Sequence, residues 1–314
     1  MRKLFPEIGI GVSMKRGNAI MRPVYSVASW FGRNHPETMI RLRYFLRFHK
    51  FPNLNTPKTL NEKIIWLSLR TDTAKWSELA DKYSVREYVK KQGLEDALVK
   101  LYGVWSSASE IDFDKLPDAF VLKPTHGSGN IVIVRDKNLV DRRVLTNFLN
   151  ECLSAKYGEL EGGKHYFRIT PRIVAEELLQ NDEVSARYSE SIVDYKVWCF
   201  DGRATYVWAC VNRDCDGASV MLYDLNWNAH PEYCIFTSHY RRSEILPQPQ
   251  NLGKMIEVAE KLSKGFPVVR VDLYNIAGRV FFGEMTFTSL GGMMDFYTEE
   301  FQQLAGDMIT LPGR

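Results

Sequence analysis

Two carboxylates inside apolar segments near the end of the chain restrict its fold most strongly. Asp272 lies within residues 268–275 (VVRVDLYN), Glu284 lies within residues 280–288 (VFFGEMTFT), and a turn at Ala277-Gly278 separates them. This composition predicts an antiparallel hairpin that can set the carboxylates opposite each other. Two buried like charges require a cation between them, and Mg²⁺ prefers carboxylate and phosphate oxygens. Arg270 shares the strand parity of Asp272, so a structural pair of arginine and carboxylate is the alternative.

A glycine-rich loop follows a lysine at the end of another predicted strand. Residues 120–123 (FVLK) end at Lys123, and the loop PTHGSGN contains Gly127, Ser128 and Gly129 before the strand-like residues 131–135. Glycines let backbone amides approach a phosphate, and a lysine adds a positive charge. An ordinary hairpin turn has the same composition, and the chain has neither a Walker A loop nor a dinucleotide-binding fingerprint.

Composition narrows the class of protein. The chain has 314 residues, enough for two domains or one composite domain, and its net charge of +3 gives no reason to expect a nucleic-acid partner. Its five cysteines are odd in number and form no C-x-x-C pair, which favours a reducing cytoplasm over a disulfide scaffold. No apolar run is long enough to span a membrane, and residues 1–20 do not resemble a signal peptide.

The segment 38–50 (TMIRLRYFLRFHK) predicts a basic amphipathic helix. Ile40, Tyr44 and Phe48 recur at helical spacing, with arginines between them. Such a helix either docks on the core of its own protein or lies on an anionic membrane surface. A cytoplasmic protein with peripheral membrane contact is therefore one prediction.

Several further residues have both a functional and a structural interpretation. Lys82 begins a predicted helix over residues 81–92, where a surface lysine is ordinary. Glu176 and Glu177 follow an apolar segment and form either a hinge or a solvated pair. Asp194 and Lys196 share one strand face and form either a ligand site or an ion pair. The candidate acid–base groups are His126 and His165, although single histidines are usually structural.

Taken in order, these segments resemble a known family. The run comprises LNEKIIWL, LADKYSVREYV, AFVLKPTHGSGN, PRIVAEELL, DYKVWCFDG, VVRVDLYN and FFGEMTFT. It resembles the TupA-like branch of the ATP-grasp fold over about residues 40–300, a branch named for teichuronopeptide synthesis. The resemblance implies an α+β fold with the nucleotide between a lid and a larger antiparallel-sheet subdomain. It divides the chain into a helical extension (1–60), the start of the core (61–116), the lid (117–178) and the C-terminal subdomain (179–314).

The resemblance also implies how ATP is held. Lys82 and Lys123 would contact its phosphates, and the loop Gly127, Ser128 and Gly129 would close over them. The remaining nucleotide contacts would come from the hinge and from the next strand. Backbone groups of the hinge would read adenine, and an acidic group of the strand would meet the ribose. The hinge residues are Glu176, Glu177, Leu178 and Leu179, and the strand residues are Asp194 and Lys196.

Metal binding and catalysis are implied for the late hairpin and its neighbour. Asp272 and Glu284 would hold Mg²⁺, with Thr286 where many ATP-grasp enzymes have asparagine. Arg270 would stabilise the charge that develops in the reaction, and Arg213 is a candidate for the γ-phosphate.

The implied reaction is ADP-forming ligation. A carboxylate attacks the γ-phosphate of ATP, and an amine then displaces phosphate from the acyl-phosphate to give an amide. The resemblance points to a uronic-acid carboxylate of a bacterial surface polysaccharide or its precursor, joined to an amino acid or small amine.

Three other functions remain open at this point. A kinase on the same fold would phosphorylate a glycan hydroxyl. A glycosyltransferase would need a D-x-D motif, and Asp112-Phe113-Asp114 matches only as a string in a predicted loop. A non-catalytic glycan-assembly protein would tolerate loss of Lys123 or Glu284.

Overall fold

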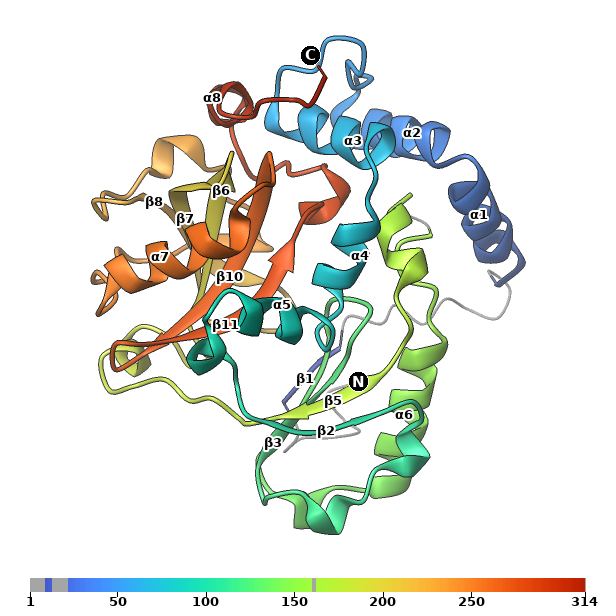
Figure 1. The fold of residues 1–314 in the computed structure, drawn as a ribbon, viewed down its shortest axis with the longest axis vertical. Helices are drawn as coiled ribbons and strands as arrows, with labels where there is room; N and C mark the ends of the chain where they lie inside the picture. Colours follow the sequence, from blue (N-terminus) through green and yellow to red (C-terminus); the bar gives the residue numbers. More distant parts are fainter. Residues whose placement is uncertain (1–8, 13–21, 160–161, 314) are drawn as a thin grey trace.

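Two β-sheets form the body of the protein. The computed structural model describes residues 9–12, 22–159 and 162–313. One sheet has five strands in the order β1-β4-β3-β5-β2, and the other has six in the order β11-β10-β6-β7-β8-β9. The two sheets lie one above the other in Figure 1, where the six-stranded sheet occupies the upper left.

The six-stranded sheet is formed by residues from the second half of the chain. Its strands are β6 (Asp194–Phe200), β7 (Arg203–Val211), β8 (Ala218–Asp224), β9 (Tyr240–Arg242), β10 (Val268–Ile276) and β11 (Arg279–Thr286). The amphipathic helix α7 (Leu252–Ser263) packs on β10, β6 and β7 with its buried residues. Alternate residues of β6 and β10 therefore face this core, and the others are turned to the opposite side of the sheet.

The predicted hairpin is present. β10 and β11 pair antiparallel, with Asp272 opposite Glu284 and Arg270 opposite Thr286. A bulge follows Asp272, because Leu273 pairs with Phe282 and leaves Gly283 extra. A Cβ at Gly283 would lie 2.9 Å from the carbonyl oxygen of Asp272, so only glycine fits this close approach.

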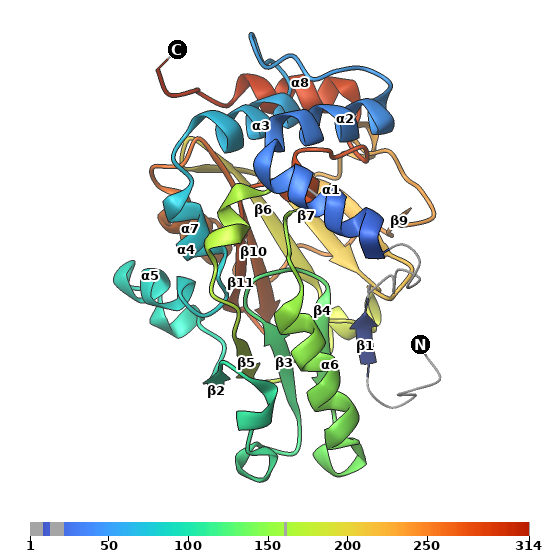
Figure 2. The same ribbon diagram turned by 90° about the vertical axis from the view of Figure 1, so that its right-hand side faces the viewer.

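The five-stranded sheet carries the glycine-rich loop. Its strands are β1 (Gly9–Val12), β2 (Leu101–Trp105), β3 (Phe120–Pro124), β4 (Asn130–Val134) and β5 (Ile173–Glu176). Helix α6 (Arg142–Ser154) follows Asp141, whose side chain accepts hydrogen bonds from the amides of Arg143 and Val144. Figure 2 shows α6 beside this sheet. A small core joins helix and sheet through Phe120, Leu122, Leu145 and Leu149.

The N-terminal helices lie at the top of the molecule in Figures 1 and 2. They are α1 (Arg22–Asn34), α2 (Pro36–Phe48) and α3 (Leu60–Arg70), and α3 packs on α8 (Glu299–Asp307) near the end of the chain. Thr59 and Glu62 form a capping box at the start of α3. Ile40 and Tyr44 are buried, so α2 docks on the core.

One predicted helix is shorter than expected. The helix expected over residues 81–92 is α5 (Val85–Lys91), because the Asp81 carboxylate accepts hydrogen bonds from the amides of Tyr83 and Ser84 and holds a turn there. A short helix, α4 (Ala74–Ala80), precedes this turn. The apolar segment that leads to Glu176 and Glu177 is strand β5, which ends at Glu176. Within the described ranges, no helix combines the length and hydrophobicity needed to cross a bilayer. The expectation for residues 1–20 falls mostly outside those ranges.

Candidate functional site

The acidic pair of the hairpin meets a cluster of cations at the face of the six-stranded sheet away from α7. Arg270 donates to Asp272 through Nε (2.7 Å) and through a terminal nitrogen (2.8 Å). Lys196 lies across the ladder from Asp272 and contacts the carboxylates of Asp272 and Asp194, each at 2.5 Å. The sequence left open whether these carboxylates bind Mg²⁺ or pair with Arg270. The pair of Arg270 and Asp272 forms at the position where the metal site was expected, so both alternatives concern the same site.

Charge balance holds this buried cluster together. Burial opposes every charge in it, but the cations Arg270 and Lys196 outweigh burial and lower the pKa of Asp272. Asp194 and Asp272 likewise outweigh burial and raise the pKa of Lys196. Asp272, Arg270 and Lys196 therefore remain ionised at neutral pH, and loss of any one of them would leave an unbalanced buried charge.

Lys82 connects the hairpin to the glycine-rich loop, and Lys123 of the five-stranded sheet lies beside the same loop. Lys82 Nζ lies 3.8 Å from Glu284 and donates a hydrogen bond to the carbonyl oxygen of Gly127. Lys123 Nζ donates to Glu176 at 2.8 Å, and Arg86 holds the other Glu176 oxygen at 3.0 Å. Burial lowers the pKa of Lys82, the nearby Glu284 opposes this shift, and the Lys123 charge adds to it.

Five groups from separate parts of the chain thus share one site. They are the two lysines, the acidic pair and the glycine-rich loop. From the sequence, only the resemblance to a known family predicted that these groups lie together. The backbone contributes as well, since the Lys82 amide donates to the carbonyl oxygen of Thr125 at the base of the loop (3.2 Å).

The glycine-rich loop lies under an aromatic contact. Ser128 and Gly129 are exposed, and Ser128 Oγ is hydrogen-bonded to the hydroxyl of Tyr157 (2.7 Å). A Cβ at Gly127 would lie 3.1 Å from the Tyr157 ring. Tyr157 in turn meets Tyr166 edge-on, with ring centroids 4.8 Å apart. The loop therefore has a partner that can hold it in one position.

Sequence reasoning missed several neighbours of this site. Burial raises the pKa of Tyr274 and Tyr166 well above the usual value for a phenol, so both stay protonated donors. The carboxylates of Asp194 and Glu284 add to the shift at Tyr274. Tyr274 shares the strand parity of Arg270 and Asp272, so the alternation along this strand could have indicated Tyr274 as a neighbour of the site. No spacing in the sequence indicated Arg86, Tyr157 or Tyr166.

The other predicted residues lie at the edges of the cluster. Arg213 approaches Asp194 at 3.6 Å, and Thr286 Oγ1 accepts a hydrogen bond from Arg270 at 3.2 Å. Glu176 ends β5, and the Glu177 amide donates to the carbonyl oxygen of Lys100 (2.9 Å). Leu178 and Leu179 then begin the connection from β5 to β6, which leads from one sheet to the other. The carboxyl group of Glu176 is buried and pairs with Lys123 and Arg86, so the solvated alternative is wrong, whereas the hinge alternative stays a prediction.

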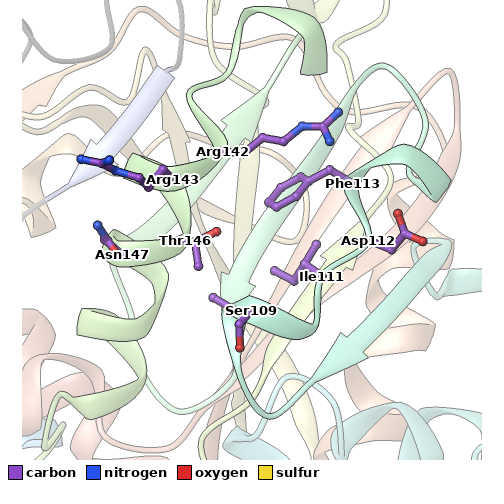
Figure 3. A pocket seen from close by; sticks show the side chains of 9 residues that line it. Ser109, Ile111, Asp112, Phe113, Arg142, Arg143, Thr146 and Asn147 are labelled. Atoms are coloured by element: carbon purple, nitrogen blue, oxygen red, sulfur yellow. The ribbon is translucent and has the colours of Figure 1, made fainter.

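A separate hollow lies on the outer side of the five-stranded sheet, between α6 and the loop before β3. Its volume is about 420 Å³, and Figure 3 shows Phe113, Arg142 and Thr146 among its lining residues. None of the predicted site residues lines it. A smaller cavity includes Lys82, Lys123, Gly127 and Gly129. The predicted site residues therefore lie away from the hollow beside α6 and next to the smaller cavity.

The acidic pair fits a divalent cation bound together with phosphates. Glu284 forms no hydrogen bond within the described residues, and Asp272 Oδ1 accepts only one there, so lone pairs are available on both. No group of three or more His, Cys, Asp or Glu side chains suited to a metal occurs in the described ranges. Phosphate oxygens would have to complete the coordination, as Mg²⁺ commonly allows.

These features define a class: two sheets with a basic, glycine-lined site between them and a carboxylate pair on a hairpin. The chain belongs to the TupA-like ATP-grasp family, whose model matches residues 62–310. No curated protein matches the chain.

Solved structures show similarity at low identity. D-alanine–D-alanine ligase from Bacillus anthracis, complexed with ATP, is 15% identical, with a TM-score of 0.44, over 76% of this chain and 67% of that one. The ATP-grasp ligase PsnB, complexed with a precursor peptide and AMPPNP, is 11% identical, with a TM-score of 0.38, over 79% of this chain and 64% of that one. The chain thus spans about two thirds of the length of these proteins. It is the match to the family model that shows a fold of the ATP-grasp type.

Proposed function

We propose that the protein is an ATP-dependent, ADP-forming ligase that joins a carboxylate to an amine. The observation that supports this most directly is the position of Lys82, which contacts Glu284 of the acidic hairpin and the carbonyl oxygen of Gly127 in the loop. A triphosphate lying between hairpin and loop would meet Lys82 and Lys123. Membership of a family with ligase neighbours agrees with this function.

The charges of the chain suit the first step of such a reaction. An attacking carboxylate and a triphosphate repel each other, and Lys82, Lys123 and Arg270 are placed to reduce that repulsion. Asp272 and Glu284 would hold Mg²⁺, which when bound neutralises phosphate charge and polarises the transferred group. Arg270 is held by Asp272 at 2.7 Å and by Ser289 Oγ at 2.7 Å, so it is oriented before substrate arrives.

The second step requires that water be kept from an acyl-phosphate. The glycine-rich loop and Tyr157 can cover the phosphates, and the amine then attacks the acyl carbon and releases phosphate. The hinge would be the connection after Glu176, with backbone groups of Glu177 and Leu179 reading adenine. Asp194 would meet the ribose, Lys196 would hold Asp194 and Asp272 in place, and Arg213 would meet the γ-phosphate.

The substrate class we propose is a uronic acid of a bacterial surface polysaccharide or its precursor, amidated by an amino acid or small amine in the cytoplasm. The support is the resemblance to the TupA-like branch. The test measures ADP release with a panel of uronates crossed with amines, followed by the mass of the product. Hydroxylamine separates this function from a kinase, because an acyl-phosphate yields a hydroxamate and a phosphorylated hydroxyl does not. ADP release without hydroxamate or amide would overturn the proposal.

A further inference from the structure

Helix α2 has two apolar stripes on different sides. Ile40 and Tyr44 form the inner stripe and are buried. Leu42, Phe45 and Leu46 recur at the same helical spacing on another side, with 49%, 40% and 66% of their surface exposed. The arginines of α2 lie between these stripes. A helix that only docks on its own core needs the inner stripe alone, so the outer stripe requires a separate explanation.

The outer stripe continues beyond the helix. Phe51, 63% exposed, stacks on Phe45 with ring centroids 4.9 Å apart. The neighbouring helix α1 exposes Val27 and Trp30 to 67% and 60%. This region contains more than half of the large apolar side chains that are exposed in the described part of the chain, namely Val27, Trp30, Leu42, Phe45, Leu46 and Phe51. We call Leu42, Phe45, Leu46 and Phe51 the α2 outer stripe.

The segment that carries the stripe has a net positive charge. Residues 27–51 contain five arginines or lysines and one glutamate, whereas the rest of the chain is slightly acidic. Four of these cations form ion pairs, namely Arg33 with Glu159, Arg41 with Glu37, Arg47 with Asp295, and Lys50 with Glu299. Each of the four cations is at least a third exposed, so water and salt screen the pairs and lipid phosphates can compete for the cations.

We propose that the α2 outer stripe docks on an anionic phospholipid surface. Apolar side chains would enter the boundary between headgroups and acyl chains while the arginines meet lipid phosphates, and exposed Trp30 on α1 suits the same boundary. A second copy of the chain fits less well, because a two-fold interface would place the same positive charges opposite each other. The helix has only 13 residues, so it lies on the membrane surface.

The test is co-sedimentation of the full chain with lipid vesicles. Vesicles containing phosphatidylglycerol should bind the protein more strongly than pure phosphatidylcholine, and added salt should weaken the binding. The variant Leu42→Ser/Phe45→Ser/Leu46→Ser should lower partitioning by at least about tenfold. The matched control is Leu139→Ser/Val184→Ser/Ile245→Ser, which removes exposed apolar side chains elsewhere and should bind like the wild type.

Two additional measurements separate the outcomes. If the triple variant unfolds, Arg47→Ala/Lys50→Ala gives a second test, since it removes charge outside the core and should reduce binding to anionic vesicles. Sedimentation velocity gives the oligomeric state. Failure of the wild type to bind anionic vesicles would overturn the proposal. So would equal binding by the stripe variant, or a dimer that this variant dissociates. ATP turnover without lipid should be unchanged in the stripe variant, so the result is independent of the ligase proposal.

Discussion

Asp272 lies directly opposite Glu284 across the β10–β11 ladder, yet the two carboxylates have different surroundings. Asp272 is buried and accepts hydrogen bonds from Arg270 and Lys196. The Glu284 side chain is 34% exposed, and its nearest cations, Lys82 and Arg270, are 3.8 Å and 3.9 Å away. Asp272 therefore maintains the charge balance of the sheet, and Glu284 has the freedom to take a ligand.

This difference predicts that two isosteric substitutions differ in their effect on stability. Glu284→Gln should lower ATP turnover by about a hundredfold or more, because it removes a carboxylate from the metal and phosphate site. Its free energy of unfolding should stay close to that of the wild type. Asp272→Asn should also lower turnover, since it removes the other carboxylate of that site, and it should in addition cost about 3–5 kcal/mol of folding free energy, because Arg270 and Lys196 lose their buried partner.

Urea unfolding and steady-state ATP turnover of both variants test this contrast. Equal destabilisation by the two substitutions would contradict it, as would full turnover in Glu284→Gln.

The sequence indicated the hairpin well because its signals are local. Strand parity was enough to predict that Arg270 and Asp272 share a face. A regular two-residue turn would set Gly283 opposite Asp272, and the bulge at Gly283, which the alternation did not indicate, brings Glu284 there instead. The partners of Lys123 could not be predicted in this way. Its partner Glu176 comes from the neighbouring strand β5, and Arg86 of helix α5 holds the same carboxylate, so only the folded arrangement of distant segments brings the three together. Tyr157 and Tyr166 lie in a segment without periodicity, so no pattern marked them.

The salt bridge from Lys123 to Glu176 leads to a second prediction. Lys123→Met should weaken ATP binding by about tenfold to a hundredfold, the effect of losing one charge-assisted hydrogen bond. Glu176→Gln should weaken it less, because Lys123 stays present but loses its anchor. Isothermal titration with a non-hydrolysable ATP analogue measures both. Lys75→Met, at an exposed lysine of α4, is the control and should bind normally. A larger effect of Glu176→Gln than of Lys123→Met would show that Glu176 has another role.

His165 makes stability depend on pH. Its ring is buried beside Trp76, both ring nitrogens lack a hydrogen-bond partner, and burial lowers its pKa from 6.5 to about 3. Below pH 6.5 the unfolded chain gains a proton that the folded chain does not bind. Stability is therefore lost as the pH falls from 6.5 towards 3. From about pH 7 to about pH 5, this histidine alone should cost about 2 kcal/mol.

The measurement is urea unfolding of the wild type and His165→Leu at both pH values. The variant should lose about 2 kcal/mol less than the wild type over this range, because leucine does not titrate. Parallel losses in the two proteins would show that His165 is protonated in the folded state.

The last prediction concerns the two glycines of the loop, which are constrained for different reasons. A Cβ at Gly127 would lie 3.1 Å from the Tyr157 ring, whereas Gly129 has open space but a φ of +84°. Gly127→Ala should therefore displace Tyr157, and Gly129→Ala should strain the backbone. Both should lower kcat/KM for ATP. Adding Tyr157→Ala should restore activity to Gly127→Ala, measured against Tyr157→Ala alone, because it removes the ring that the new methyl group meets. The same addition should give no rescue of Gly129→Ala. Rescue of both glycine variants, or of neither, would mean that contact with Tyr157 does not set the position of the loop.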